Sequence, residues 1–360
     1  LWAWAFAEVF FDGKMRALFA MLFGASILLM AERNDSPGIV RRHLARMAVL
    51  LGIGMVHAWL IWSGDILVTY ALVGMLVFPW RNLPVRRLFL LAVIGLALQV
   101  SVNVSAAIQG QHLERLVAAG RADASDREQL AALHDSTNTS PEDAAREVVE
   151  MRGDWHSVQS VRARSTRTMQ TVIIPMLFVV ETAALMLLGM ALYRLGWWQG
   201  RMLPAAYRRM ALLALPMLAM GAILPAVYAA NGFRTVDFLW MDALRMVVGP
   251  VIAIGYSAAL ILLQHSGRLR WLTDRLAAAG QMALTNYLMT SILMTTLFYG
   301  TGFGLFGSLS RAQLWVPVLA MWALILLWSK PWLRHFVQGP FEWLWRSLAR
   351  GKAQPFVRRQ

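Results

Sequence analysis

Long apolar runs recur along the whole chain and restrict its fold more than any other feature of the sequence. Leu18–Met30 and Met282–Gly300 are two of them, in a chain of 360 residues of which 58% are hydrophobic. A helix of about 20 apolar residues spans the hydrocarbon core of a bilayer. Lipid offers the backbone no hydrogen-bond partners, so only helices and closed barrels cross it. Barrel strands alternate in polarity, whereas these runs are continuous. The sequence therefore predicts an all-α, polytopic transmembrane helix bundle.

The apolar runs divide into nine predicted spans. They cover about residues 15–31, 47–62, 66–80, 88–108, 170–192, 210–230, 239–263, 281–300 and 314–329. The chain begins at Leu1 rather than at a methionine, and nine spans would place this end on the opposite side of the membrane from the C-terminus. One further span upstream would place both ends on the same side. We therefore expect ten spans in the intact protein.

Positive charge is concentrated in alternate loops between the spans. The net charge is +14, and arginines gather around Arg41, Arg81, Arg194 and Arg268 and in the tail from Lys330 onward. Loops on the cytoplasmic side of a membrane carry an excess of Lys and Arg. The pattern predicts a multi-pass membrane protein with a cytoplasmic C-terminus and membrane lipids as partners. It favours this topology over a nucleic-acid partner as the reason for the charge.

One long polar stretch, residues 109–168, separates the spans of residues 1–108 from those of residues 169–329. It holds ten of the twenty acidic residues, and long segments cross the membrane regardless of charge. Ser125 with Glu128, and Ser140 with Pro141, are typical helix starts. We expect a small extracytoplasmic helical cap here. The aromatic and basic tail, residues 330–360, is expected to lie at the cytoplasmic interface.

The chain contains no cysteine, which excludes disulfides, thiolate metal sites and a cysteine nucleophile. No metal site is predicted. Gly302–Gly307 reads G-x-G-x-x-G, but it follows a membrane helix and lacks the strand and helix that a dinucleotide site requires. We interpret it as a turn.

The strongest candidate site lies where the second and third spans meet. An ionisable group inside a bundle is costly unless it is paired, so such residues are functional candidates. His57 and Asp65 could face each other across a tight turn, with His57 as a base that Asp65 orients. Alternatively, Asp65 caps the third span, and His57 bonds a neighbouring carbonyl. Tyr70 is a substrate-binding candidate one and a half turns farther on.

Glu181 is the most deeply placed acid in the predicted spans, within PMLFVVETAALMLLGM. Such a carboxylate is neutral or faces an arginine from another helix. A substrate-binding role and a structural role are both open for it. Lys14 and Arg16 flank the first span, and we interpret them as rim charges that reach toward headgroups.

Two further polar groups lie near span ends. Asp242 and Arg245 are three residues apart and can pair on one helix face, either as a structural pair or along a solute pathway. Asn286 and Tyr287 form a polar notch at the start of the eighth span. Asn often joins helices within a membrane, and the alternative for this notch is contact with an acyl donor.

Four stretches carry a resemblance to a known family. They are FFDGKMRALFAMLFGAS (Phe10–Ser26), MVHAWLIWSGDILVTYALVG (Met55–Gly74), MALTNYL with TTLFYG (Met282–Gly300) and RHFVQGPFEWLWR (Arg334–Arg346). With these motifs the chain resembles the YeiB-like bacterial inner-membrane family, whose members carry domain of unknown function 418 and normally begin with one more span. The resemblance implies a bacterial inner-membrane location.

The architecture of this family is distantly similar to membrane acyltransferases that move acetyl groups from cytoplasmic acetyl-CoA to external sugars. Their essential histidine lies outside the matched stretches and is not assigned to a residue here. We predict an acyltransferase-like enzyme with His57 and Asp65 as its catalytic pair, and with Asn286 and Tyr287 near an acyl-CoA donor. The alternative is a transporter or a lipid- or solute-binding protein that uses Glu181 and the Asp242–Arg245 pair.

Overall fold

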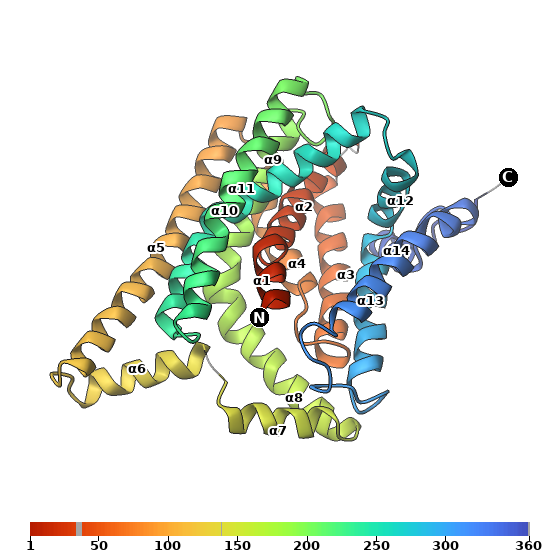
Figure 1. Cartoon of the computed structure of the whole chain (residues 1–360). Helices are drawn as coiled ribbons and strands as arrows, with labels where there is room; N and C mark the ends of the chain where they lie inside the picture. Colours follow the sequence, from red (N-terminus) through yellow and green to blue (C-terminus); the bar gives the residue numbers. More distant parts are fainter. Residues whose placement is uncertain (34–37, 138, 359–360) are drawn as a thin grey trace. The chain divides into compact units, whose positions relative to one another are not determined.

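Helices make up the regular structure of the computed structural model, which describes residues 1–33, 38–137 and 139–358 (Figure 1). In chain order they are α1 (Trp2–Phe10), α2 (Lys14–Arg33), α3 (Ile39–Leu60), α4 (Leu67–Val77), η1 (Phe78–Asn82), α5 (Val85–Ala118), α6 (Ala124–Thr137), α7 (Pro141–Met151), α8 (Trp155–Thr168), η2 (Met169–Phe178), α9 (Val179–Arg194), α10 (Pro204–Ala230), α11 (Thr235–His265), α12 (Arg270–Gln281), α13 (Ala283–Phe298), α14 (Trp315–His335) and α15 (Pro340–Arg350). Phe336 and Val357 form an isolated β-bridge. The predicted all-α class is confirmed. Residues 359–360 of the predicted tail lie outside the described ranges.

Seven helical segments in the described ranges are long and apolar enough to cross a membrane. They are Trp2–Glu32, Ile39–Leu60, Val85–Ala118, Trp155–Arg194, Pro204–Ala230, Thr235–His265 and Trp315–His335. The other two predicted spans coincide with shorter helices, α4 with 11 residues and α13 with 16. At 1.5 Å per residue, α4 extends only about 16 Å, roughly half of a hydrocarbon core about 30 Å thick. The nine predicted spans therefore correspond to seven helices that are long and apolar enough to cross a membrane and to two shorter apolar helices, and the number of crossings stays a prediction.

The predicted cap region begins with an extension of α5 and continues through α6, α7 and α8. Ser140 caps α7 as predicted, because its Oγ accepts a hydrogen bond from the Asp143 backbone N–H at 3.0 Å. The predicted Ser125 cap is wrong. Asp123 Oδ1 instead accepts from the Asp126 N–H at 2.7 Å, and Asp126 Oδ2 accepts from the Asp123 N–H at 3.1 Å. A reciprocal pair of aspartates thus starts α6, and Ser125 lies inside it.

The helices α8, η2 and α9 follow one another without an intervening loop, so the cap region continues directly into the fifth predicted span. η2 is π-helical and contains Pro175. Proline has no N–H to donate and its ring clashes with the preceding turn, and a widened π turn accommodates this defect. At the end of η2, the Val179 N–H bonds the Ile174 carbonyl, five residues back.

The described chain groups into two compact units, each of which combines distant parts of the sequence. Unit 1 comprises Leu1–Ala25, Leu83–Glu147 and Val180–Leu260, and unit 2 comprises Ser26–Asn82, Val148–Val179 and Ile261–Gln360. Four of the five boundaries fall within helices α2, α7, α9 and α11, and the fifth follows η1.

Unit 1 is held together by a close crossing of α2 and α9. Gly24 faces the Met186 carbonyl and Gly189 faces the Met21 carbonyl, and a Cβ on either glycine would collide with the opposing backbone. Small residues let membrane helices approach closely enough for dispersion and polar contacts to hold them together. The FGAS motif therefore contains Gly24 for packing. The residues around the crossing, such as Ala20 and Met190, are fully buried.

Unit 2 is built around the hairpin of α3 and α4, which pack along each other (Figure 1). Gly54 of α3 faces the start of α4, where a Cβ would lie 2.8 Å from the Val68 nitrogen. Helix α15 packs on α3 and α13, and α12 packs on α14. The close approach at Gly54 brings the first turn of α4 against α3, and the candidate site forms there.

Candidate functional site

The predicted His57–Asp65 pair is formed at the α3–α4 hairpin. His57 Nδ1 lies 2.7 Å from Asp65 Oδ1, and the two side chains are 1% and 2% exposed. Asp65 Oδ2 accepts a hydrogen bond from the Val68 N–H at 2.8 Å, which satisfies a free donor at the start of α4. Asp65 thus contacts His57 with one carboxylate oxygen and the first turn of α4 with the other, and its role in orienting a catalytic base stays a prediction.

Tyr287 joins this pair from α13. Its hydroxyl lies 3.3 Å from Asp65 Oδ1 and accepts a hydrogen bond from the Ile66 N–H at 3.2 Å. Its ring centroid lies 5.0 Å from the imidazole centroid of His57. The sequence predicted that Tyr287 contacts an acyl donor at a place separate from His57 and Asp65. The structure instead brings the three residues together, although Tyr287 and Asp65 are 222 residues apart in sequence. We call them the His57 cluster.

The two nitrogens of His57 have different surroundings. An ionised carboxylate only accepts hydrogen bonds, so the Asp65 contact assigns the proton to Nδ1. His57 Nε2 is buried and has no hydrogen-bond partner within the described part of the chain. A neutral imidazole with Nδ1 protonated has its lone pair on Nε2. The cluster therefore holds a histidine in one tautomer with its basic nitrogen unused.

A cavity of about 430 Å³ adjoins the His57 cluster. Its lining includes Trp62, Thr290 and Ser291, and Ser291 lies one helical turn beyond Tyr287, whose carbonyl it bonds. The indole of Trp62 stands edge-on to the His57 imidazole, with centroids 6.3 Å apart. Trp62 thus contacts both the cavity and the catalytic candidate. The rest of the lining is mostly apolar, with residues such as Met294 and Leu314.

The start of α13, which carries Tyr287, is fixed by Glu342 of α15. Glu342 Oε1 accepts from the Thr285 N–H at 3.0 Å, and Oε2 accepts from Thr285 Oγ at 2.5 Å. Gly339 is required beside this contact, since its Cβ would strike Glu342 and Thr285. Glu342 and Gly339 belong to the QGPFEWLWR motif, and Thr285 belongs to MALTNYL. Sequence reasoning did not assign Glu342 a role, although an acid in an aromatic amphipathic helix was a usable signal.

Asn286 lies next to these residues and joins three helices of unit 2. Its Nδ2 donates to the Ala279 carbonyl at 3.0 Å and to Ser329 Oγ at 3.2 Å, and its Oδ1 accepts from Trp328 Nε1 at 3.0 Å. These bonds match the predicted interhelical role. A direct contact between Asn286 and an acyl donor stays a prediction. Tyr70 is buried in α4 and also stays a candidate.

The acids and arginines of unit 1 form ion pairs. Arg16 Nη1 lies 2.6 Å from Glu181 Oε2, and the Glu181 side chain is 7% exposed. This arrangement supplies the arginine from another helix that the sequence required for Glu181. Lys14 is buried at 2% exposure and donates to the Glu8 carbonyl at 2.6 Å. The interpretation of Lys14 and Arg16 as rim charges is therefore wrong.

Arg245 is the centre of a second network in unit 1. It pairs with Asp242 as predicted, and also with Glu8 at 3.1 Å and with Asp12 at 2.5 Å. The other oxygen of Asp242 accepts from Asn103 Nδ2 at 2.7 Å. Asn103, Glu8 and Asp12 were missed because they lie far from Arg245 in sequence, Asn103 on α5, Glu8 on α1 and Asp12 in the turn between α1 and α2.

No group of three His, Asp or Glu side chains that could hold a metal ion is found among the described residues.

Comparison with known proteins places these motifs in one family. The family described as "Protein of unknown function (DUF418)" matches residues 192–352. "Uncharacterized protein YeiB" of Escherichia coli (strain K12) is 31% identical over 99% of this chain and 86% of its own length. "Uncharacterized protein YxaH" of Bacillus subtilis (strain 168) is 28% identical over 98% of this chain and 83% of its own length. No solved structure matches the chain.

Proposed function

The chain belongs to the YeiB-like family of proteins that carry DUF418, and we propose that it is a transmembrane acyltransferase in which His57 is the general base. One observation carries the proposal: a buried histidine has Nδ1 fixed by Asp65 and a basic Nε2 without a partner. A base held in one tautomer by a carboxylate is the arrangement that activates a hydroxyl nucleophile.

The chemistry follows from this geometry. Nε2 removes the proton from an acceptor hydroxyl as its oxygen attacks the carbonyl carbon of an acyl thioester. The new C–O bond replaces the C–S bond, and the proton passes from Nε2 to the departing thiolate. The products are an ester and a free thiol, and no other reactant is needed. Asp65 stabilises the imidazolium that forms between these steps.

The adjoining cavity suits the binding of an apolar group. Its largely apolar lining and volume of about 430 Å³ fit an acyl chain or a lipid-linked acceptor. Because His57 Nε2 is shielded, the substrate reaches it when the exposed Trp62 side chain moves aside.

The protein would lie in the bacterial inner membrane with its C-terminus in the cytoplasm, as the basic loops predict. The acyl-CoA donor would then arrive from the cytoplasm, and the acceptor would bind on the other side beneath residues 109–168.

The alternative of a transporter uses Glu181, Asp242 and Arg245. All three are ion-paired in unit 1, and a transport cycle would have to break and re-form these pairs. The unpartnered Nε2 of His57 favours the enzyme, because an ion-pair pathway gives this atom no role.

The test is acyl transfer by the purified full-length protein in proteoliposomes. Protein is incubated with ¹⁴C-labelled acetyl-CoA and total membrane extract as the acceptor pool, and labelled product and free thiol are counted. We expect equal amounts of both products, and we expect His57→Ala and Asp65→Ala to remove them.

Arg234→Gln is the matched control, because it removes an exposed ion pair with Glu114 in unit 1. Turnover that survives in both His57→Ala and Asp65→Ala would refute the assignment of these residues. Solute counterflow in the same vesicles, independent of acyl-CoA, would favour the transporter instead.

A further inference from the structure

Arginines from two helices of unit 2 line a cavity that the proposed chemistry does not use. The cavity has a volume of about 640 Å³ and is lined by Met30, Ile39, Arg41, Arg42, Ala45, Arg46, Ala349 and Arg350. A neighbouring cavity of about 320 Å³ shares Arg46 and Arg350 and adds Arg346. None of the described residues that line either cavity is acidic. We call the two together the arginine cavity.

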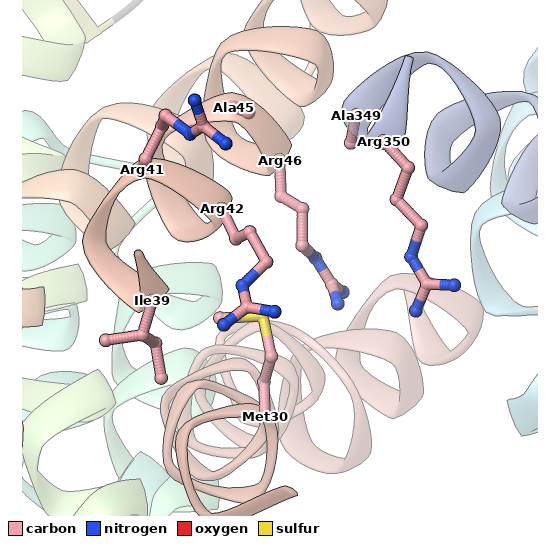
Figure 2. A pocket seen from close by; sticks show the side chains of 8 residues that line it. All are labelled: Met30, Ile39, Arg41, Arg42, Ala45, Arg46, Ala349 and Arg350. Atoms are coloured by element: carbon pink, nitrogen blue, oxygen red, sulfur yellow. The ribbon is translucent and has the colours of Figure 1, made fainter. Parts of the chain in front are cut away.

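The guanidinium groups of Arg42, Arg46 and Arg350 lie side by side (Figure 2). Arg42 and Arg46 come from α3 and Arg350 from the last turn of α15, while Met30 of α2 lies below them. Arg41 extends the other way in this view. The like charges of Arg46 and Arg350, which line both cavities, repel each other, and an anion between them offsets that repulsion. A guanidinium fork matches the oxygens of a phosphate in a bidentate manner.

Arg46 is held in place for such a contact. Its guanidinium stacks on the Trp345 ring, 4.6 Å from the centroid, and Trp345 Nε1 donates to the Arg46 carbonyl at 2.7 Å. Arg46 Nε is nevertheless buried and has no hydrogen-bond partner among the described residues. Buried donors in native proteins are almost always satisfied. An unsatisfied guanidinium N–H in a cavity lined by arginines is a donor that fits an anionic ligand.

We propose that the arginine cavity is a binding site for a phosphate group. The phosphate can belong to the headgroup of an anionic lipid, as in basic pockets between membrane helices, or to a soluble organic phosphate. Both sources present negatively charged phosphate oxygens to Arg42, Arg46 and Arg350. The site is distinct from the His57 cluster, and the inference does not depend on acyl transfer.

Two binding measurements on the purified full chain separate the two sources. In detergent at low salt, pyrophosphate is titrated by calorimetry. In parallel, native mass spectrometry records which lipid stays bound after exchange into micelles that contain phosphatidylglycerol or phosphatidylcholine. Binding of pyrophosphate alone indicates a soluble phosphate, and selective retention of phosphatidylglycerol indicates a headgroup. Either result supports the site, provided that the variants below weaken it.

Arg350→Gln is the main variant, because this exposed residue at the end of α15 can change without disturbing the fold. We expect at least tenfold weaker binding, equivalent to about 1.4 kcal/mol. Arg46→Gln should weaken binding more than Arg350→Gln does. Arg350→Lys should weaken it less, because lysine keeps the positive charge but lacks the two parallel N–H donors of the guanidinium. The control is Arg334→Gln, an exposed arginine at the end of α14 that lines neither cavity.

The proposal fails if the wild-type chain binds neither probe. It also fails if Arg334→Gln weakens binding as much as Arg350→Gln, because binding then reflects the diffuse charge of the chain and not a built site.

Discussion

The arginine networks of unit 1 and the His57 cluster of unit 2 differ in how their buried polar atoms are bonded. In unit 1, Arg245 is surrounded by three carboxylates, one of which is held by Asn103 as well, and Glu181 is paired with Arg16. In unit 2, Asp65 holds one nitrogen of His57, and the other is buried with no hydrogen-bond partner among the described residues. Pairing lowers the cost of burying a charge, and a network with every charge paired needs only a structural explanation.

The unpartnered nitrogen of His57 is a different case. A buried polar atom without a hydrogen bond lowers the stability of the folded protein. Such destabilising features occur most often at functional sites. The comparison therefore favours a structural role for Glu181 and Arg245 and agrees with the catalytic role that we propose for His57.

The sharpest test of this separation is Asp65→Asn. Asparagine caps a helix about as well as aspartate, so α4 should keep its start and the melting temperature should change little. The amide no longer selects the Nδ1-protonated tautomer or stabilises the imidazolium. We expect acyl transfer to fall by about 10² to 10⁴-fold, measured as initial rate per folded molecule. An unchanged rate would mean that Asp65 only caps the helix.

Arg245→Met should have the opposite profile. It leaves Glu8, Asp12 and Asp242 without their common cation, and breaking a buried ion pair on one side costs about 3–5 kcal/mol. We expect a large loss of thermal stability in detergent and an unchanged acyl-transfer rate in the fraction that stays folded. Arg234→Gln is the control, because exposed ion pairs contribute only about 0–1 kcal/mol. If the rate also falls, the unit 1 network takes part in function.

Glu342→Gln tests whether α13 must be anchored for the His57 cluster to form. The amide keeps the shape of the side chain but weakens the charge-assisted bonds to Thr285, which are worth about 1.5–3 kcal/mol each. We expect a moderate loss of stability together with a partial loss of turnover, since Tyr287 lies two residues beyond Thr285. Asp274→Asn, at an exposed ion pair with Lys330, should change neither quantity.

The smallest effect concerns Asp154, which caps α8. Hydrogen bonds from the Ser157 backbone N–H and hydroxyl lower the pKa of Asp154 below its ordinary value of 3.8. Because the folded pKa is the lower one, the cap contributes fully above pH 3.8 and is lost as the pH falls below it. Hydrogen exchange of the first turn of α8 should therefore be protected at neutral pH and less so near pH 3. Asp154→Asn should remove this pH dependence, and its persistence would point to another acid.

The sequence was sufficient for the helical class and for contacts that are local in the chain. Apolar runs predicted the helices, and an eight-residue separation made the His57–Asp65 contact foreseeable across a tight turn. It was not sufficient for helix type or length, since the predicted span of residues 66–80 forms the 11-residue α4 followed by the short 3₁₀ helix η1. The partners from distant helices, Tyr287 for Asp65 and Glu8 for Arg245, could not be predicted, because no local period says which helices meet. The arginines of the cavity were seen only as topology signals, since their convergence depends on α15 packing against α3.

The residues of the His57 cluster and Glu342, which anchors α13, leave the ribosome at different times. His57 and Asp65 are close in the chain and can meet as soon as their hairpin has entered the membrane. Tyr287 can join them only after 222 more residues have been made. Glu342, which anchors the start of α13, follows Thr285 by another 57 residues. The ribosome therefore delivers His57 and Asp65 well before Tyr287, and a growing chain that has not reached Tyr287 cannot form the complete His57 cluster.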